Sequence, residues 1–178
     1  IVWGMTQFGG KYDLGKIFTI TAAGQIKKVF DFNGANGQEP RGSLFEIGGK
    51  IWGMTIKGGE TDNGVIFNIN TDGTSFQKVH DFEGGLNGVG PWSNTLVESG
   101  GKVWGSTFDG GAFEAGVIFS LNVDGTGFEK NYDFSASLIK VENNLYGIET
   151  NGLFSLDLDG GAYTLILPTN TLIADPHS

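Results

Sequence analysis

The sequence predicts an all-β fold, a β-propeller built from four-stranded antiparallel blades. A Trp-Gly motif recurs along the chain, as Trp3-Gly4, Trp52-Gly53 and Trp104-Gly105, with a diverged copy at Tyr146-Gly147. The repeat unit of roughly 40 to 50 residues has the length of one propeller blade. Glycine (31 residues) and phenylalanine (14 residues) are frequent, which is typical of short strands joined by tight turns.

The composition of the 178 residues argues against several classes of protein. Eleven basic and 20 acidic residues give a net charge of −9, and an acidic surface repels phosphate, so we expect no nucleic-acid partner. No apolar run approaches the roughly 20 residues needed to cross a bilayer, so we expect no membrane insertion. Cysteine is absent, which excludes disulfides and thiolate metal sites and suits a bacterial surface protein as well as a cytosolic one. The chain starts inside its own motif and without Met, so we interpret it as a processed or excerpted piece of a longer product.

Each repeat is predicted to contain four strands, which we name A to D in chain order. Strand B carries the Trp-Gly motif, and a loop with a Gly-Gly pair follows it. Strand C contains an apolar pair that ends in Phe, at Ile17-Phe18, Ile66-Phe67, Ile118-Phe119 and Leu153-Phe154. The Trp precedes this Phe by 15 residues in the first three repeats, whereas Tyr146 precedes Phe154 by only 8. The fourth repeat has therefore lost its Gly-Gly loop.

A turn joins strands C and D, and its sequence is Asp-Gly at 72–73, 124–125 and 159–160 and Ala-Gly at 23–24. Asp-Gly between apolar residues is a strong hairpin signal, because Gly tolerates the positive φ that the turn needs. Asp72 and Asp124 could also suggest a calcium site, but calcium takes six to eight oxygen ligands and this turn supplies too few. We interpret both aspartates as turn residues, and we expect neither a metal nor a cofactor.

Strand D of the first three repeats ends near an aspartate, at Asp31, Asp81 and Asp133. A catalytic residue is usually unique, whereas a structural residue recurs with its unit, so we expect these aspartates to be structural. His80 falls where the other repeats have Phe30 and Tyr132. We therefore interpret His80 as a packing residue.

The strands group into a single propeller domain. The predicted blades are residues 1–34 with 169–175, then 42–84, 92–134 and 136–168. The first blade is split because the chain begins on strand B, while residues 170–173 resemble an A strand. A terminal A strand that pairs with the first blade would close the ring and remove an exposed edge. Three arrangements stay open: a closed four-bladed ring, two chains joined into an eight-bladed ring, and a natural protein with more repeats.

The pattern Gly-Lys-(Ile/Val)-Trp-Gly-x-Thr, followed by Gly-Gly, Gly-Val-Ile-Phe and Asp-Gly-Thr, resembles the GloVer tandem repeat. The resemblance is strong over residues 1–134 and weaker over 135–178, where Tyr146 replaces the Trp. It implies a bacterial β-propeller-like repeat protein, secreted or anchored at the cell surface. The family carries no well-defined reaction, so the resemblance implies no catalytic residue.

We expect a ligand on the face formed by the B–C loops and the D–A loops, which include residues 36–40 and 87–91. These loops are longer and more variable than the turns of the opposite face, and such loops on a rigid scaffold usually carry binding. The candidate residues are Tyr12, Arg41, Trp92, Asp109, Phe113 and Glu114. Trp92 could stack on a sugar ring or pack its own loop, and Arg41 could pair with a carboxylate.

We expect a non-enzymatic extracellular module for binding or adhesion, with a glycan or a surface protein as its partner. The alternative is a structural repeat unit of a bacterial surface or filament protein that self-associates through its terminal strand. A third hypothesis is a glycan-active enzyme that uses carboxylates such as Asp109 and Glu114. No nucleophile elbow, His-Glu-x-x-His motif or P-loop supports an enzyme, and His80 and His177 do not have metal-ligand spacing.

Overall fold

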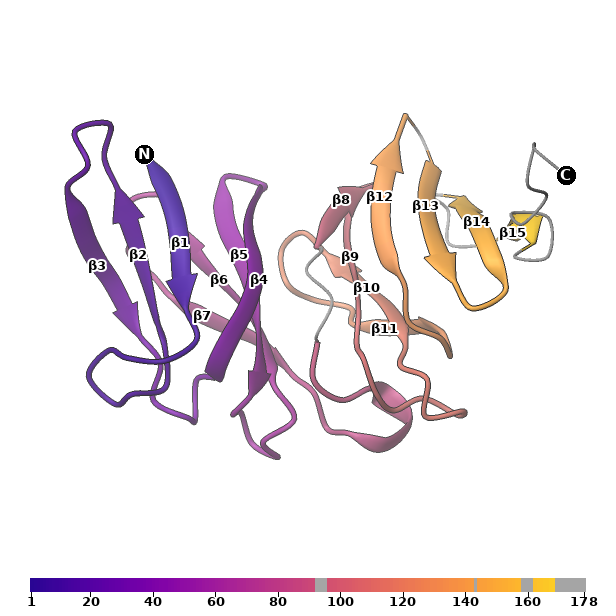
Figure 1. The fold of residues 1–178 in the computed structure, drawn as a ribbon, viewed down its shortest axis with the longest axis horizontal. Helices are drawn as coiled ribbons and strands as arrows, with labels where there is room; N and C mark the ends of the chain where they lie inside the picture. The colour runs from indigo at the N-terminus through magenta and orange to yellow at the C-terminus, as the bar shows by residue number, and fades with distance from the viewer. Residues whose placement is uncertain (92–95, 143, 158–161, 169–178) are drawn as a thin grey trace, which may run out of the picture.

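The computed structural model describes residues 1–91, 96–142, 144–157 and 162–168, and these residues form four antiparallel sheets (Figure 1). The first sheet contains β1 (Val2–Thr6), β2 (Lys16–Ile20) and β3 (Ile26–Asp31). The second contains β4 (Gln38–Ile47), β5 (Lys50–Lys57), β6 (Val65–Asn70) and β7 (Gln77–Asp81). After a short 3₁₀ helix, η1 (Gly85–Asn87), the third contains β8 (Val97–Ser99), β9 (Lys102–Ser106), β10 (Ile118–Asn122) and β11 (Glu129–Tyr132). The fourth contains β12 (Ser137–Val141), β13 (Asn144–Glu149), β14 (Gly152–Asp157) and β15 (Tyr163–Pro168).

Within each sheet the strands pair in chain order, each antiparallel to the next. The first sheet contains strands B, C and D of its repeat, and the other three sheets contain A to D. This arrangement confirms the predicted all-β fold of mostly four-stranded antiparallel sheets. The A strand predicted at residues 170–173 lies outside the described residues. Among the residues that the structure describes, no helix is long and apolar enough to cross a membrane.

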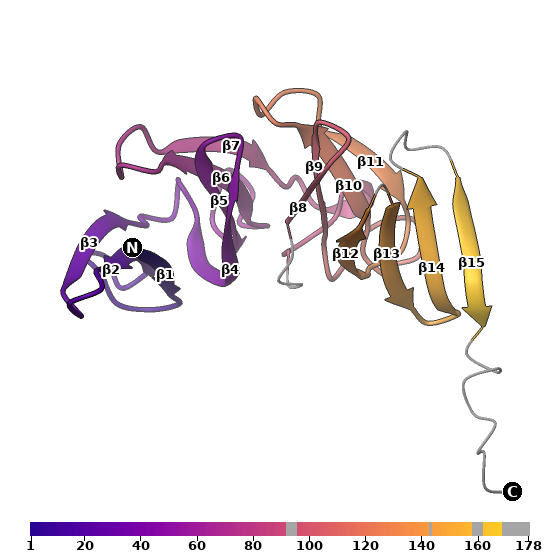
Figure 2. The ribbon, with the colours of Figure 1, turned by 90° about the horizontal axis from the view of Figure 1, so that it is seen from above.

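The four sheets stand in a row that curves into an open arc, with the first and fourth sheets at its two ends (Figures 1 and 2). Each sheet packs one face against the next sheet, so the apolar core is divided among three junctions. We number these junctions in chain order. We call the face of a sheet that points toward the following sheet its forward face, and the opposite face its backward face.

The tryptophans of the repeated motif build the forward faces. Trp52 and Trp104 are fully buried against the sheets that follow them. The indole N–H of Trp52 donates a hydrogen bond to the carbonyl of Ile47 (3.1 Å), and that of Trp104 donates to Ser99 (3.3 Å). Each buried indole thus satisfies its one donor at the end of strand A in its own sheet.

The glycine of the motif is required by the phenylalanine of strand C. Gly53 lies directly across from Phe67, and a Cβ at Gly53 would come within 2.5 Å of the Phe67 ring. The same cross-strand pair recurs as Gly4 with Phe18, Gly105 with Phe119 and Gly147 with Phe154. The fourth repeat keeps the pair although it has lost its long loop, because the missing residues lie outside the paired strands. The Trp-Gly motif therefore reflects the register of strands B and C, and it does not depend on the length of the loop between them.

An aromatic cluster fills each junction. Two aromatic side chains from the end of strand D pack against one from strand C and one from the C–D hairpin of the next sheet. At the first junction Phe30 stacks on Phe76 with ring centroids 3.7 Å apart, and Phe32 meets Phe67 edge-on at 5.3 Å. The third junction repeats the arrangement with Tyr132, Phe134, Phe154 and Tyr163.

His80 belongs to the cluster at the second junction, in agreement with its interpretation as a packing residue. Its ring stacks on Phe128 at 3.7 Å and meets Phe82 edge-on at 5.2 Å. Burial lowers the pKa of His80 below its ordinary value, so the neutral ring is favoured. Within the described residues, its Nε2 atom has no hydrogen-bond partner.

Strand β4 begins earlier than the sequence predicts, which corrects our assignment of residues 38–40 to a loop. The strand starts at Gln38, which pairs with Lys57, and the register then shifts at a bulge after Arg41. Pro40 lies within this strand, across from Thr55. β4 is an edge strand, where a proline N–H is not needed for pairing.

Candidate functional site

The B–C and D–A loops share one edge of the row of sheets, which we call the loop edge. At the first junction the amide of Gly59, in a B–C loop, donates to the carbonyl of Gly34 in the preceding D–A connection (2.8 Å). At the second junction Gly111 donates to Gly85 in the same way (2.9 Å). The B–C loops of the second and third sheets are therefore each bound to the connection that follows the preceding sheet.

The three recurring aspartates hold the B–C loops in place. Oδ1 of Asp133 accepts a hydrogen bond from the backbone N–H of Ala112 (2.8 Å) and pairs with Nζ of Lys130 (2.6 Å). The other two make the same contacts, Asp31 with Lys11 and Lys28, and Asp81 with Glu60 and Lys78. The lysine hydrogen bond is the main cause that lowers the pKa of Asp31 and of Asp133. These aspartates are structural, as their recurrence predicts.

The aspartates of the C–D turns serve the turns themselves. Oδ1 of Asp72 accepts hydrogen bonds from the backbone N–H and the hydroxyl of Thr74 (2.8 and 2.6 Å). Asp124 makes the same two bonds with Thr126 (2.9 and 2.7 Å), and these bonds lower the pKa of both carboxyl groups. In the part of the chain that the structure describes, no group of three or more His, Asp or Glu residues is placed to hold a metal ion.

Two predicted site residues, Tyr12 and Phe113, occupy the same position of the B–C loop, two residues after the Gly-Gly pair. Tyr12 is 48% exposed, and its ring centroid lies 4.9 Å from Nζ of Lys11. The ring of Phe113 is 79% exposed. The two residues follow strands of the first and third sheets, so the structure does not bring them together.

Glu114, another predicted site residue, occupies the next position of the B–C loop, where the backbone has a positive φ in all three long loops. Asp13, Asp62 and Glu114 all have a positive φ, of 60°, 61° and 52°. Asp62 supports this conformation by accepting a hydrogen bond from the N–H of Gly58 (2.8 Å). The backbone at Glu114 is therefore a property of the repeated loop, and its side chain is exposed.

The remaining predicted residues lie in different places. Asp109 is exposed at the start of the same loop as Phe113, where its backbone forms a bridge with Val89. Arg41 is half-buried on β4, across from Met54. Trp92 lies outside the described residues. Of the six candidates, the structure therefore places Asp109, Phe113 and Glu114 in one loop, and Tyr12 and Arg41 elsewhere.

A hollow of about 490 Å³ opens on the loop edge at the third junction. The residues that line it come from both sheets: Phe113, Asp133 and Phe134 from the third, and Glu149, Asn151 and Tyr163 from the fourth. Phe113 is the only predicted site residue among them.

The hollow exists because the fourth repeat has lost its B–C loop. Only Thr150 and Asn151 join β13 to β14, whereas residues 58–64 join β5 to β6. At the first junction the longer loop lies over the end of the preceding sheet, through the bond from Gly59 to Gly34. The two-residue turn is too short to do the same, and Asp133 and Phe134, which follow β11, line the hollow instead.

Hydrogen bonds fix the polar groups of the hollow. The hydroxyl of Tyr163 donates to Oε1 of Glu149 (2.7 Å), and Nδ2 of Asn151 donates to Oε2 (3.3 Å). Burial, followed by the bond to Glu149, raises the pKa of Tyr163 to about 12, so the phenol stays protonated at neutral pH. Asp133 lies on the opposite wall with its pKa lowered. The hollow thus combines one exposed aromatic ring with two carboxyl groups held in place.

Sequence analysis missed Glu149, Asn151 and Tyr163. The lost loop of the fourth repeat is visible in the sequence and could have marked this junction as different. Tyr163 also stands where the earlier repeats have Phe76 and Phe128, so its hydroxyl is a second signal. That these side chains line the same hollow as Phe113 depends on how two sheets pack, which the spacing of residues does not give.

Solved structures of similar fold show the fold class of this chain. The chain is similar to one in a crystal structure of a nidogen/laminin complex, with 18% identity and a TM-score of 0.60, covering 86% of this chain and 55% of that chain. The chain thus spans about half the length of that relative. It is also similar to the tricorn protease, with 16% identity and a TM-score of 0.46, covering 91% of this chain and 16% of that one. At 18% identity the first likeness shows the fold alone, that of a β-propeller-like repeat module.

The chain belongs to the Gloeobacter/Verrucomicrobia repeat family, whose sequence profile matches residues 1–158. This match confirms the resemblance to the GloVer tandem repeat. A search of curated proteins found no match.

Proposed function

We propose that this chain is a non-enzymatic binding module that takes an uncharged glycan in the hollow at the third junction. The observation that carries the proposal is the exposed ring of Phe113 at a hollow that also contains Glu149 and Asp133. An aromatic ring offers a flat apolar surface to the C–H face of a sugar, and carboxylates accept hydrogen bonds from its hydroxyl groups. This combination suits a ligand that is rich in hydroxyl groups.

Charge favours an uncharged sugar over an acidic one. Asp133 and Glu149 both line the hollow, and the whole chain carries a net charge of −9. Lys130 already forms an ion pair with Asp133 at 2.6 Å, so its charge is balanced within the protein and does not attract an acidic ligand. A glycan that carries carboxylate or sulfate groups would be repelled.

The state of the carboxyl groups supports binding without catalysis. A glycosidase needs one carboxyl group that holds a proton near neutral pH. The pKa of Asp133 is lowered, so this group is ionised and cannot act as that acid. Both oxygens of Glu149 already accept hydrogen bonds, from Tyr163 and Asn151.

We place this module outside a bacterial cell or on its surface, as the family resemblance implies, where it would bind a free glycan or the glycan of a surface protein. The second candidate function is a structural repeat unit. It is favoured by the apolar faces that are exposed at the two ends of the arc (Figure 2).

The proposal is tested by titrating the chain with neutral oligosaccharides and with uronic-acid oligosaccharides of the same length, using isothermal titration calorimetry. We expect at least one neutral oligosaccharide to bind with a Kd between about 1 μM and 1 mM, and the acidic ones to bind more weakly. The substitution Phe113→Ala should raise that Kd about tenfold, because it removes the stacking surface.

The matched control is Tyr12→Ala, which removes an exposed aromatic ring from the same loop position of the first sheet. It should leave the Kd unchanged. If no neutral oligosaccharide binds at about 10 mM, the proposal is wrong. If Tyr12→Ala weakens binding and Phe113→Ala does not, the site lies elsewhere on the loop edge.

A further inference from the structure

We propose that the forward face of the fourth sheet binds the backward face of the first sheet in a second copy of this chain. The proposal concerns the outward faces of the first and fourth sheets, which stand at the two ends of the arc (Figure 2), and not the hollow between the third and fourth sheets. The three internal junctions show what covers such faces, since each joins a forward face to a backward face.

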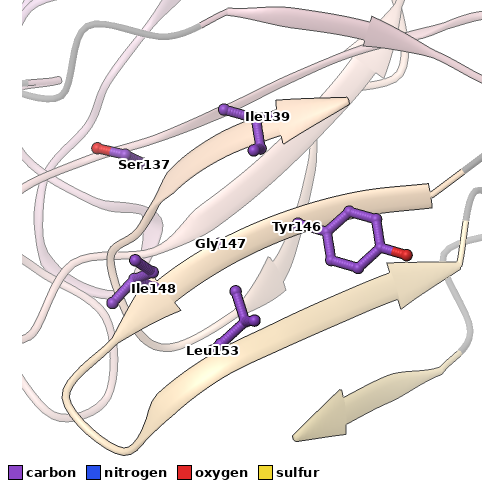
Figure 3. Close-up of a pocket in the computed structure, with 6 residues that line it drawn as sticks. All are labelled: Ser137, Ile139, Tyr146, Gly147, Ile148 and Leu153. Atoms are coloured by element: carbon purple, nitrogen blue, oxygen red, sulfur yellow. The ribbon is translucent and has the colours of Figure 1, made fainter. Parts of the chain in front are cut away.

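The forward face of the fourth sheet is apolar and uncovered. Ile139, Tyr146, Ile148 and Leu153 lie on β12, β13 and β14 and line a shallow hollow of about 230 Å³ (Figure 3). Ile148 pairs with Leu153 just as Met54 pairs with Ile66 in the second sheet. Ile148 is 68% exposed, whereas Met54 is 5% exposed because the third sheet covers it.

Among the described residues, none covers the backward face of the first sheet either. Val2 pairs with Ile20, in the register that joins Ile51 to Ile69 and Val103 to Leu121. Val2 is 66% exposed, whereas Ile51 and Val103 are 4% and 0% exposed. Ile26, also on this sheet, is exposed as well. Exposed apolar faces of this kind on a soluble domain mark interaction sites.

The two end faces carry the side chains that an internal junction requires. At the second junction Trp52, Met54 and Ile66 pack against Val103, Phe119 and Leu121. On the forward face of the fourth sheet, Tyr146, Ile148 and Leu153 occupy the positions of Trp52, Met54 and Ile66. On the backward face of the first sheet, Val2, Phe18 and Ile20 occupy the positions of Val103, Phe119 and Leu121. A second copy can therefore supply the complementary face.

The C–D turns support the same alignment. At the first junction the turn at Gly73 lies against Val29, where an added Cβ would be 3.0 Å from Cγ1. At the second junction Gly125 lies against Val79 in the same way (3.0 Å). The corresponding turn of the first sheet contains Gly24, which has open space around it. Ile166 on β15 is exposed and occupies the position of strand D that Val29 and Val79 occupy in the first two sheets. Gly24 of a second copy would therefore lie against Ile166.

Such a contact is head to tail, because it joins two different faces. Contacts of this type form a ring if the rotation closes and a filament if it does not. They need no exchange of the terminal strand.

The test measures molar mass by sedimentation velocity over a concentration series. For the unchanged chain we expect a shift from 18.9 kDa at low concentration to a dimer or larger species at high concentration. Val2→Asp on one face and Ile148→Asp on the other should each raise the dissociation constant about tenfold or more, because a charge would be buried in the contact.

Mixing the two variants separates this arrangement from a symmetric one. Each variant keeps one intact face, so an equimolar mixture should form heterodimers that neither variant forms alone. A mixture that stays monomeric would overturn the head-to-tail contact. Ile148 and Val2 are both exposed, so neither change disturbs the core of a sheet, and circular dichroism checks that each variant is folded.

Leu86→Asp is the matched control. Leu86 is 64% exposed, but it lies in η1 on the loop edge, away from both end faces. This variant should associate like the unchanged chain. A single species of 18.9 kDa up to about 0.5 mM would overturn the proposal, as would an Ile148→Asp variant that associates normally.

Discussion

The second and third junctions are built from the same repeat, yet they differ at the loop edge. Both have a buried Trp on the forward face, Trp52 in one and Trp104 in the other. At the second junction a long B–C loop covers the edge, and Gly111 binds Gly85. At the third junction the two-residue turn leaves a hollow of about 490 Å³. The core of a junction can therefore persist while the loop that covers it is lost.

This difference shows that two separate sets of residues maintain the repeat. The faces are held by cross-strand pairs such as Gly147 with Phe154, which the fourth sheet keeps. The loop is held by the aspartate at the end of strand D, and Pro168 replaces it in the fourth sheet. A repeat that loses its loop has no further need of that aspartate, which explains why both are missing together.

The largest expected effect comes from comparing an internal forward face with the terminal one. Trp52→Ala should reduce the free energy of unfolding by about 3–5 kcal/mol, because it empties a fully buried site and removes the bond to Ile47. Tyr146→Ala, at the same motif position, should cost less than about 1.5 kcal/mol, because no sheet covers its face. Urea denaturation measures both. Equal losses would mean that a further sheet covers the terminal face in solution.

A smaller effect is expected from removing the charge that holds a B–C loop. Asp133→Asn keeps an acceptor for Ala112 but loses the ion pair with Lys130, so it should reduce stability by about 1 kcal/mol. The lowered pKa of Asp133 also predicts acid sensitivity. The ionised Asp133 stabilises the folded state above the ordinary pKa of Asp, and this stabilisation is lost as the pH falls through the lowered pKa of Asp133 in the folded state.

Urea denaturation at about pH 6 and about pH 3 tests this assignment. The difference in stability between the unchanged chain and Asp133→Asn should be present at the higher pH and should shrink at the lower one. Leu167→Asn, next to Pro168 on β15 of the fourth sheet, is a control in which no charge changes and no such pH dependence should arise. A difference that is the same at both pH values would show that the charge of Asp133 does not act.

The smallest expected effect concerns His80. Because its pKa is lowered by burial, the unfolded state binds more protons as the pH falls below about 6.5, and stability decreases there. His80→Phe should remove this dependence and change stability at neutral pH by less than about 1 kcal/mol. Phe30→His, at the same position of the first junction, should introduce the dependence that His80→Phe removes. Thermal unfolding between pH 5 and pH 8 measures both variants.

The repeat pattern predicted the strand order well, because each motif residue has a partner in its own sheet. The cross-strand pair of Gly53 with Phe67 recurs at the same spacing in three repeats, so it can be recognised without coordinates. The pattern failed at the start of β4, where residues 38–40 were assigned to a loop; Pro40 is tolerated there because β4 is an edge strand. It also selected Tyr12 and Phe113 as unrelated candidates, although both fill one position of the repeated loop.

What the sequence by itself determined is the repeat: its strands, its turns and the structural role of Asp31, Asp81 and Asp133. These follow from contacts within one sheet, between residues close together in the chain. What only the tertiary structure decided is which groups from different sheets meet. Phe113 and Tyr163 are 50 residues apart in sequence, yet they line one hollow. The exposure of Val2 and Ile148 is likewise set by whether a neighbouring sheet is present, because the same positions are buried in the second and third sheets, which have a neighbour on both sides.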